Sequence, residues 1–255
     1  MTPFQRVIIE KTGHDNGFEH VLTATADAIT LASARHRSHA VVSVSQPQGF
    51  DTRFQSPSPL FRELQRTHGP SITSNHAFHS DTQVALALLL RRAATLSQAL
   101  PNQAEQDYQA AVKQALTQLP PESRATEIER LVRQRIGQDR YRAAMLDYWG
   151  HACAVTGVNI PEVLRASHAK PWAECENDDE RLNVFNGFLL TANLDALFDR
   201  FLISFDDTGA LVVAPGLSQT DLLTLGIQPD MKLRWLTDDH RAYLRWHHRR
   251  FLETT

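Results

Sequence analysis

One histidine and two aspartates in the last third of the sequence have the side chains that phosphodiester hydrolysis requires. His168 ends a short run typical of a strand, and Asp195 and Asp199 stand four residues apart in a predicted helix. Residues at this spacing share one helix face, so both carboxylates are expected to point the same way. A neutral imidazole can take a proton from an attacking water near pH 7. Carboxylates can hold a divalent ion that neutralises the scissile phosphate and the leaving oxygen.

The elements predicted around these residues are a strand, a loop, a second strand and a helix. The segment Val163 to Ala169 is predicted as a short strand that ends at the histidine. Asn186-Gly187 predicts a turn before a returning strand over residues 188–190. Asn193 is predicted to cap the helix that follows. This order would bring one imidazole and two carboxylates together, although the same residue types occur in many soluble proteins.

Four short motifs in residues 150–205 carry a family resemblance. In this stretch the sequence resembles the HNH, or ββα-metal, endonucleases, and most closely the branch with His-x-x-Pro-Trp, Asn-Gly and Leu-Phe-Asp motifs. The resemblance covers about residues 137–255 and leaves residues 1–136 outside it. The matching segments are Cys153 to Gly157, His168 to Trp172, Asn186-Gly187 and Leu197-Phe198-Asp199.

The resemblance implies a role for each motif residue. His168 falls at the position of the general base, and Asn186 falls at the asparagine that braces the loop and orients that base. Asp195 stands where most relatives carry a metal-binding histidine. A carboxylate suits Mg²⁺ or Mn²⁺, so we expect one divalent ion of this kind, with Ni²⁺ as a third option. Ser167 stands where many relatives have an acidic ligand, so Asp199 is the predicted second ligand.

Each of these residues also has a plain structural interpretation. A lone histidine is more often a satisfied core residue than a catalyst, and Asn186 could simply hold a turn, which is also its role in the family. Asp195 could serve only as a negative charge at a helix start, and Asp199 could pair with an arginine such as Arg200. The motif favours catalysis for His168 and metal binding for Asp195, and it leaves Asp199 open.

Basic residues at three places are candidates for contact with the DNA backbone. Lys170 lies inside the histidine motif, and Arg35 and Arg37 belong to a basic stretch in the N-terminal region. Arg245 and Arg249 lie in a predicted C-terminal helix with interleaved aromatic residues. A solvated turn and a solvated helix face are the plain alternatives for the last two places.

Length and composition indicate a folded chain and exclude several classes of protein. The chain has 255 residues, 42% of them apolar, and a net charge of −3, which argues against coating nucleic acid through bulk positive charge. No apolar run approaches the roughly 20 residues of a bilayer span, and no secretory signal is evident. We therefore expect a cytoplasmic protein without a membrane partner. Cys153 and Cys175 are too few for a disulfide framework or a four-thiolate site, and no structural zinc is expected.

The sequence divides into three predicted regions. Residues 1–80 are predicted as a β-rich domain, 81–136 as a helical connection and 137–255 as the HNH endonuclease domain. The predicted fold class is α+β, with a C-terminal ββα-metal (HNH) nuclease module, a helical middle region and a β-rich N-terminal domain. Strands are expected over 4–10, 18–24, 28–34 and 40–45, and helices from residue 59 after Ser58, over 81–100, 102–119, 122–136 and 138–149.

These expectations combine into a functional hypothesis. The chain is predicted to be a metal-dependent DNA endonuclease of restriction or anti-phage defence, whose N-terminal domain selects the target, with modified DNA as one option. Target selection rests on analogy with restriction enzymes that carry appended domains, and a domain that binds a protein or small-molecule signal fits equally well. The competing class is a catalytically inactive HNH-fold DNA-binding or interaction protein, and a homodimer is a further option.

Overall fold

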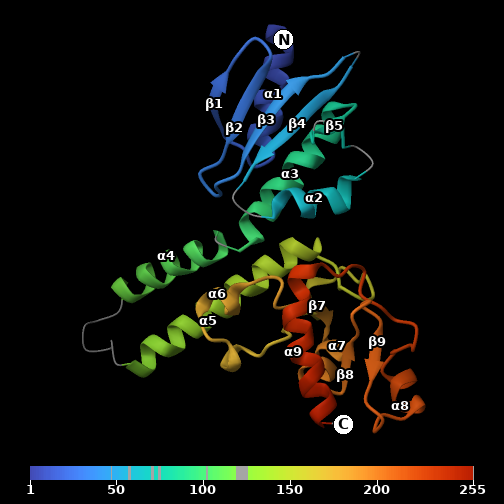
Figure 1. Cartoon of the computed structure of the whole chain (residues 1–255). Coiled ribbons are helices and arrows are strands. Elements are labelled where there is room, and N and C mark those ends of the chain that lie inside the picture. The colour runs from blue at the N-terminus through green and yellow to red at the C-terminus, as the bar shows by residue number, and fades with distance from the viewer. Residues whose placement is uncertain are drawn as a thin grey trace. The chain divides into compact units, whose positions relative to one another are not determined.

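A computed structural model describes residues 1–46, 48–56, 59–69, 72–73, 76–101, 103–118 and 126–254 of the chain (Figure 1). These residues form two compact units, Met1–Gln103 and Ala104–Thr255. The division falls later than the boundary predicted at residue 80, because the helix over residues 83–99 packs on the N-terminal helices. Each unit is described by itself.

The N-terminal unit combines an antiparallel sheet with three helices. Its described residues form a five-stranded sheet in the order β1-β2-β3-β4-β5, with strands β1 (His20–Ala24), β2 (Ala28–Ala32), β3 (His39–Val44), β4 (Phe50–Gln55) and β5 (Phe78–Ser80). The helices are α1 (Pro3–Asp15), α2 (Leu60–His68) and α3 (Gln83–Ala99). Helix α3 packs on both α1 and α2, and α1 packs on β2. The strands predicted over 18–24, 28–34 and 40–45 are present as β1, β2 and β3.

The strand predicted over residues 4–10 is wrong, because this segment belongs to helix α1. A β-branched run at residues 7–9 favours a strand locally. The helix start is stronger: the Thr2 hydroxyl accepts the Gln5 backbone N–H, the Gln5 side chain accepts the Thr2 N–H, and Pro3 fits the first helical position.

Two further strands of this unit were not predicted. β4 and β5 extend the sheet beyond β3, and β5 lies in a stretch that the sequence marks as turn-prone. The helix predicted to begin at residue 59 is present as α2, with Pro59 in the capping position. The predicted cap Ser58 lies outside the described residues.

The C-terminal unit is built around two short strands and the helices that pack on them (Figure 1). Strands β6 (Leu164–His168) and β7 (Gly187–Thr191) form an antiparallel hairpin, and β8 (Ile203–Phe205) and β9 (Leu211–Val213) form a second one. The helices are α4 (Gln103–Gln118), α5 (Thr126–Trp149), α6 (Asp178–Leu182), α7 (Ala192–Asp199), α8 (Gln219–Thr224) and α9 (Asp238–Thr254). Helix α7 packs on β6 and β7, which gives a ββα arrangement, and α5 packs on the same hairpin.

Helix α5 replaces two predicted helices. The sequence predicts a break between residues 136 and 138, but residues 126–149 form one helix that passes through Gly137. A Cβ atom at Gly137 would collide with the indole ring of Trp172. The glycine therefore lets the ring approach the helix backbone closely and does not end the helix.

Helix α7 has Thr191 in the capping position and Ala192 as its first residue. It therefore begins two residues before the start that a cap at Asn193 would give. The predicted cap Asn193 is wrong, since its side chain donates to the Leu225 carbonyl at 2.7 Å. Asp195 lies in the first turn of the helix and Asp199 is its last residue. The two carboxylates therefore lie four residues apart in one helix, as the sequence predicts.

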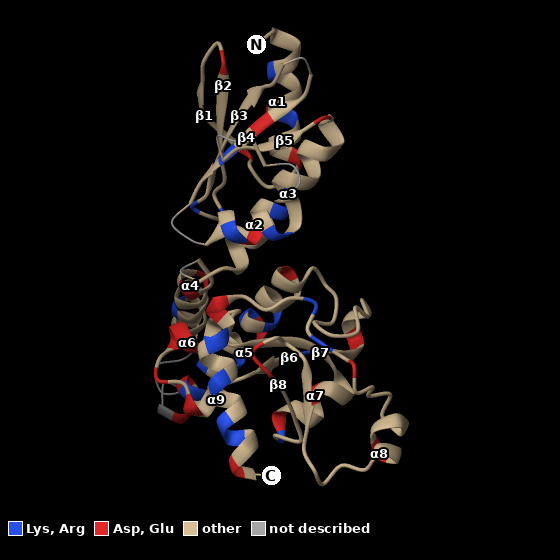
Figure 2. Ribbon diagram, turned by 45° about the vertical axis from the view of Figure 1, so that its right-hand side comes forward, with Lys and Arg blue, Asp and Glu red and all other residues tan. Residues whose placement is uncertain are grey.

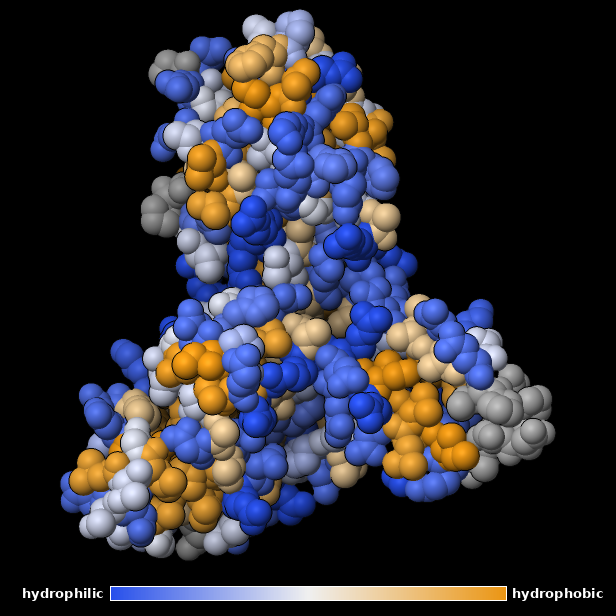
Figure 3. All heavy atoms as spheres, turned by 180° about the vertical axis from the view of Figure 1, so that it is seen from behind, coloured by the Kyte–Doolittle hydropathy of each residue, from blue (hydrophilic) through white to orange (hydrophobic). Residues whose placement is uncertain are grey.

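On the face drawn in Figure 3, hydrophobic residues gather in several patches with hydrophilic residues between them. Among the described residues, no helix combines the length and the apolar character needed to cross a bilayer.

His247 of α9 is a core histidine that couples folding to pH. It is 1% exposed, its Nε2 donates to the Phe198 carbonyl at 2.9 Å, and Nδ1 lies 3.0 Å from the Ser204 hydroxyl. The ring stacks on Phe198 with 3.7 Å between centroids. Burial lowers the pKa of His247 from 6.5 to about 4.

Because the unfolded chain takes up this proton near pH 6.5 and the folded chain only near pH 4, the stabilising contribution is complete above pH 6.5 and is lost as pH falls towards 4. The expected loss is about 3 kcal/mol of unfolding free energy. Urea unfolding between pH 7.5 and 4.5 should show a shallower pH dependence in His247→Gln than in the unsubstituted protein. His248→Gln is the matched control, and equal pH dependence in all three proteins would contradict the assignment.

Candidate active site

A cleft in the C-terminal unit gathers the residues that the sequence singles out. It lies between α5, β6, the segment after β6 and α7, and has a volume of about 540 Å³. Its walls include His168, Ser167, Asp195 and Asp199. Further lining residues come from α5, from β6 and from the segment after β6, namely Gln138, Tyr141, Arg142, Arg165, Ala166, Pro171, Trp172 and Ala173.

His168 is the last residue of β6 and its ring is held from one side. Its Nε2 lies 2.9 Å from the Arg181 carbonyl oxygen. A carbonyl only accepts, so Nε2 carries the proton and Nδ1 remains an acceptor. Burial lowers the pKa of His168 from 6.5 to about 4, and the bond to Arg181 opposes this shift only in part. The imidazole is therefore neutral at pH 7, with one nitrogen able to accept a proton.

Two aromatic rings enclose the same imidazole. Tyr141 of α5 stacks on it, with 3.8 Å between ring centroids and 18° between the planes. Trp172 meets it edge to face at 5.8 Å. The sequence indicates Tyr141 only as a core residue, so this contact with the histidine was missed.

Asn186 ties together the two ends of the segment between β6 and β7. The side chain is fully buried, and its Oδ1 accepts the Lys170 backbone N–H at 2.8 Å. Its Nδ2 donates to the carbonyls of Lys170 at 3.2 Å and Glu180 at 3.0 Å. The Glu180 carbonyl precedes the Arg181 carbonyl that holds His168. Asn186 therefore holds the chain one peptide before the carbonyl that orients the imidazole.

The two aspartates of α7 place negative charge in the cleft. Asp195 is partly buried, and burial raises its pKa above the ordinary value. The charge of Asp199 adds to this rise, whereas the Ser167 hydroxyl and Arg165 lower the pKa. The site thus holds a carboxylate whose charge is poorly balanced by the protein, a property that a bound cation would correct.

The donor set fits a divalent ion that keeps much of its water. Among the described residues, no group of three His, Cys, Asp or Glu side chains lies close enough to form a metal cage. The cleft supplies two carboxylates and the Ser167 hydroxyl, all of them hard oxygen donors. Mg²⁺ commonly uses one or two carboxylates and completes its octahedron with water and phosphate oxygens. The residues present therefore fit a site of this type.

Three cations lie in or beside the cleft. Lys170, predicted to contact DNA, has its ammonium 2.8 Å from the Glu180 carboxylate and is 12% exposed. This ion pair holds the positive charge of Lys170 against Glu180, in the segment between β6 and β7. Arg142 and Arg165 line the cleft instead, and their guanidinium groups donate to backbone carbonyls of residues 161–164.

Arg245 and Arg249 lie on one exposed face of α9, where Figure 2 shows basic residues repeating along the helix. Both line a groove of about 610 Å³ that also includes Asp206, Asp207, His248 and Phe205. Neither guanidinium pairs with a carboxylate within the described ranges. This face therefore presents two cations to solvent.

Arg35 and Arg37 lie in the N-terminal unit, in the connection between β2 and β3. Both are exposed, and the Nε of Arg35 lies 3.6 Å from a Glu19 carboxylate oxygen. An exposed ion pair of this kind contributes little to stability, so it leaves the arginine available for other partners.

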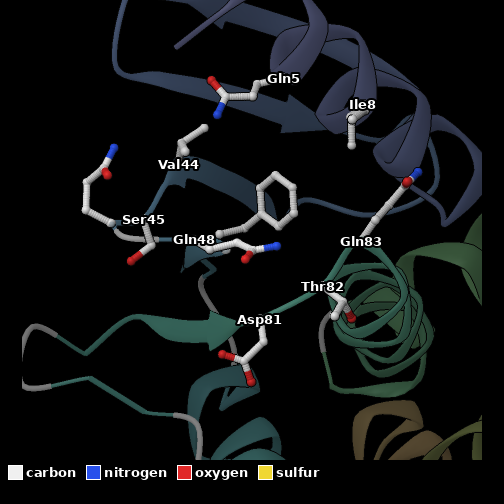
Figure 4. Close-up of a pocket in the computed structure, with 11 residues that line it drawn as sticks. Gln5, Ile8, Val44, Ser45, Gln48, Asp81, Thr82 and Gln83 are labelled. Atoms are coloured by element: carbon white, nitrogen blue, oxygen red, sulfur yellow. The ribbon is translucent and has the colours of Figure 1, made fainter.

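The N-terminal unit has a pocket of its own, which the sequence did not indicate (Figure 4). It has a volume of about 350 Å³ and lies among α1, the β3–β4 connection and the start of α3. Its lining is more apolar than polar, with amide, hydroxyl and carboxylate groups around the apolar part. The labelled lining residues are Gln5, Ile8, Val44, Ser45, Gln48, Asp81, Thr82 and Gln83.

Comparison with known families agrees with the sequence resemblance. Residues 153–206 match the HNH_2 family model, described as HNH endonuclease. This range includes His168, Asn186, Asp195 and Asp199 and leaves out α5 and α9. No curated protein matches the chain. The predicted relation to HNH endonucleases is confirmed for this segment, and the finer motif branch stays a prediction.

Proposed function

We propose that this chain, whose residues 153–206 belong to the HNH endonuclease family, hydrolyses phosphodiester bonds of DNA with the help of a divalent ion. The observation that carries the proposal is the cleft in which a neutral, oriented imidazole shares a wall with two carboxylates. An imidazole with a free acceptor nitrogen can take a proton, and paired carboxylates attract a cation.

His168 is the general base in this proposal. Its Nδ1 accepts a proton from the attacking water, while the Nε2 bond to the Arg181 carbonyl stabilises the positive charge that develops on the ring. Its depressed pKa keeps the ring neutral before the reaction. Asn186 holds the Glu180 carbonyl, one peptide before the Arg181 carbonyl that binds the ring, so its role is to position the base.

Asp195 and Asp199 would hold one divalent ion, Mg²⁺ or Mn²⁺, with Ni²⁺ as a third option. When bound, such an ion neutralises charge on the scissile phosphate and on the leaving oxygen. The raised pKa of Asp195 supports this assignment, because burial and the charge of Asp199 disfavour its charged form and a bound cation would favour it.

Binding of the DNA backbone is assigned to exposed cations. Arg245 and Arg249 contact phosphates along α9, and Arg142 and Arg165 hold the strand at the cleft. Lys170 acts indirectly, through the loop that its ion pair with Glu180 stabilises.

The N-terminal unit is proposed to select the target. Arg35 and Arg37 would contact the backbone, and the pocket of Figure 4 combines an apolar surface with hydrogen-bonding side chains, a combination that suits a modified base. This assignment makes the chain a restriction or defence nuclease of the cytoplasm, acting alone or as a homodimer.

One observation favours a second candidate, an inactive HNH-fold protein that binds DNA or a partner. Ser167 supplies no charge where an acidic ligand is expected, and the described residues contain no cage of three His, Cys, Asp or Glu ligands. A protein of this kind would keep the fold and the basic surface without cleaving its substrate.

A plasmid assay separates the two candidates. With Mg²⁺ or Mn²⁺ the purified protein should nick or linearise plasmid, and His168→Ala should lower the rate by about 10²- to 10⁴-fold, because the general base is lost. Asp195→Asn should abolish the response to metal. His14→Ala, an exposed histidine of the N-terminal unit, is the matched control. Cleavage by His168→Ala at the rate of the unsubstituted protein would reject the base assignment.

Target selection is tested by cleavage of methylated, glucosylated and plain DNA side by side. If the N-terminal unit reads a modified base, the rates should differ by about tenfold or more, since a site built to hydrogen-bond one group rejects a substrate that lacks it. Equal rates on all three substrates would contradict recognition of modified DNA and would favour a domain that binds a signal.

A further inference from the structure

We propose that Tyr141 of α5, outside the family match, is a positioning residue that fixes the direction in which His168 presents Nδ1. This inference rests on the proposed function for its catalytic meaning, but its geometric content stands on contacts within the protein. It makes α5 part of the nuclease site and not only a support for the hairpin.

The hydrogen bond from Nε2 cannot orient the imidazole alone. A single bond to the Arg181 carbonyl fixes one ring atom and allows the ring to rock about that contact. Tyr141 covers one face of the ring in a nearly parallel stack at 3.8 Å. The edge contact from Trp172 restricts the ring further. Together these contacts define the ring plane and therefore the direction of Nδ1.

Tyr141 is itself held in place. Its side chain is 2% exposed, and its hydroxyl donates to the Asn186 carbonyl oxygen at 2.9 Å. The next residue is Gly187, where any Cβ atom would collide with the Tyr141 hydroxyl and with the Ser167 carbonyl. The tyrosine thus connects the histidine ring to the residue that braces the loop.

The same face of α5 also places the second aromatic ring. Gly137 lies four residues before Tyr141, and Trp172 occupies the space that a side chain at Gly137 would fill. One helix face therefore sets the positions of both rings that contact His168. Within the described part of the chain, neither Gly137 nor Tyr141 forms a hydrogen bond with the carboxylates of α7.

The test compares Tyr141→Phe and Tyr141→Leu with Tyr148→Leu, which removes another buried tyrosine of α5 that packs on Trp149 and Phe185. All proteins are matched for folded fraction by circular dichroism. Tyr141→Leu should lower kcat by about tenfold or more with KM within about twofold, because small misplacement of a catalytic group costs rate. Tyr141→Phe keeps the stacked ring and loses only the hydroxyl, so its kcat should lie between that of Tyr141→Leu and that of the unsubstituted protein.

Tyr148→Leu should leave kcat within about twofold of the unsubstituted protein, since it leaves the stack intact. If Tyr141→Leu also keeps kcat within that range, or changes KM alone, the inference is overturned. A parallel loss in Tyr148→Leu would likewise overturn it, because the effect would then be general loosening of α5.

A second measurement separates this inference from the proposed function. The ring protons of His168 should be shifted upfield in NMR spectra by the stacked Tyr141 ring, and Tyr141→Leu should remove that shift while Tyr148→Leu preserves it. This result is independent of cleavage, so it decides the geometry even if the protein proves inactive on DNA. Unchanged His168 resonances in Tyr141→Leu would overturn the inference.

Discussion

The hydrogen bond from His168 Nε2 to the Arg181 carbonyl is the interaction on which the site depends. It decides which nitrogen carries the proton, and it therefore decides which nitrogen is left to act on a water. An imidazole in the other tautomer would present a donor to the cleft and could not serve as a base. The remaining features of the C-terminal unit can be understood as means of keeping this bond in one geometry.

Three segments converge on that bond. Asn186 ties Lys170 to Glu180 across the loop, so a buried amide holds the peptide immediately before the one that carries the Arg181 carbonyl. Helix α5 contributes the ring that lies on the imidazole. Helix α7 packs on β6 and supplies two carboxylates that line the same cleft as the imidazole. A short hairpin alone would bury too little apolar surface to hold these groups, so the helices are a requirement of the chemistry.

The sequence was informative for residues that stand in recognisable motifs. His168, Asn186, Asp195 and Asp199 belong to such motifs, and three of them, His168, Asp195 and Asp199, line one cleft of the structure. Contacts made by residues outside the motifs were not predictable in this way. The stack on Tyr141 joins residues 27 positions apart, and the ion pair that withdraws Lys170 from the surface depends on the path of the loop.

Errors in the predicted elements have the same physical origin. The β-branched residues after Phe4 favour a strand by propensity, but a capped helix start and packing against α3 stabilise α1. Gly137 resembles a helix end in isolation, yet its lack of a side chain serves the approach of Trp172. In both segments tertiary contacts outweigh the local pattern.

The tautomer of His168 tests the central claim most directly. Proton–nitrogen correlation spectra of the full-length protein with ¹⁵N-labelled histidine, recorded near pH 7, distinguish a protonated ring nitrogen from an unprotonated one. The account predicts one neutral form of His168, with the proton on Nε2 and none on Nδ1. A proton on Nδ1, or an average of the two tautomers, would contradict it.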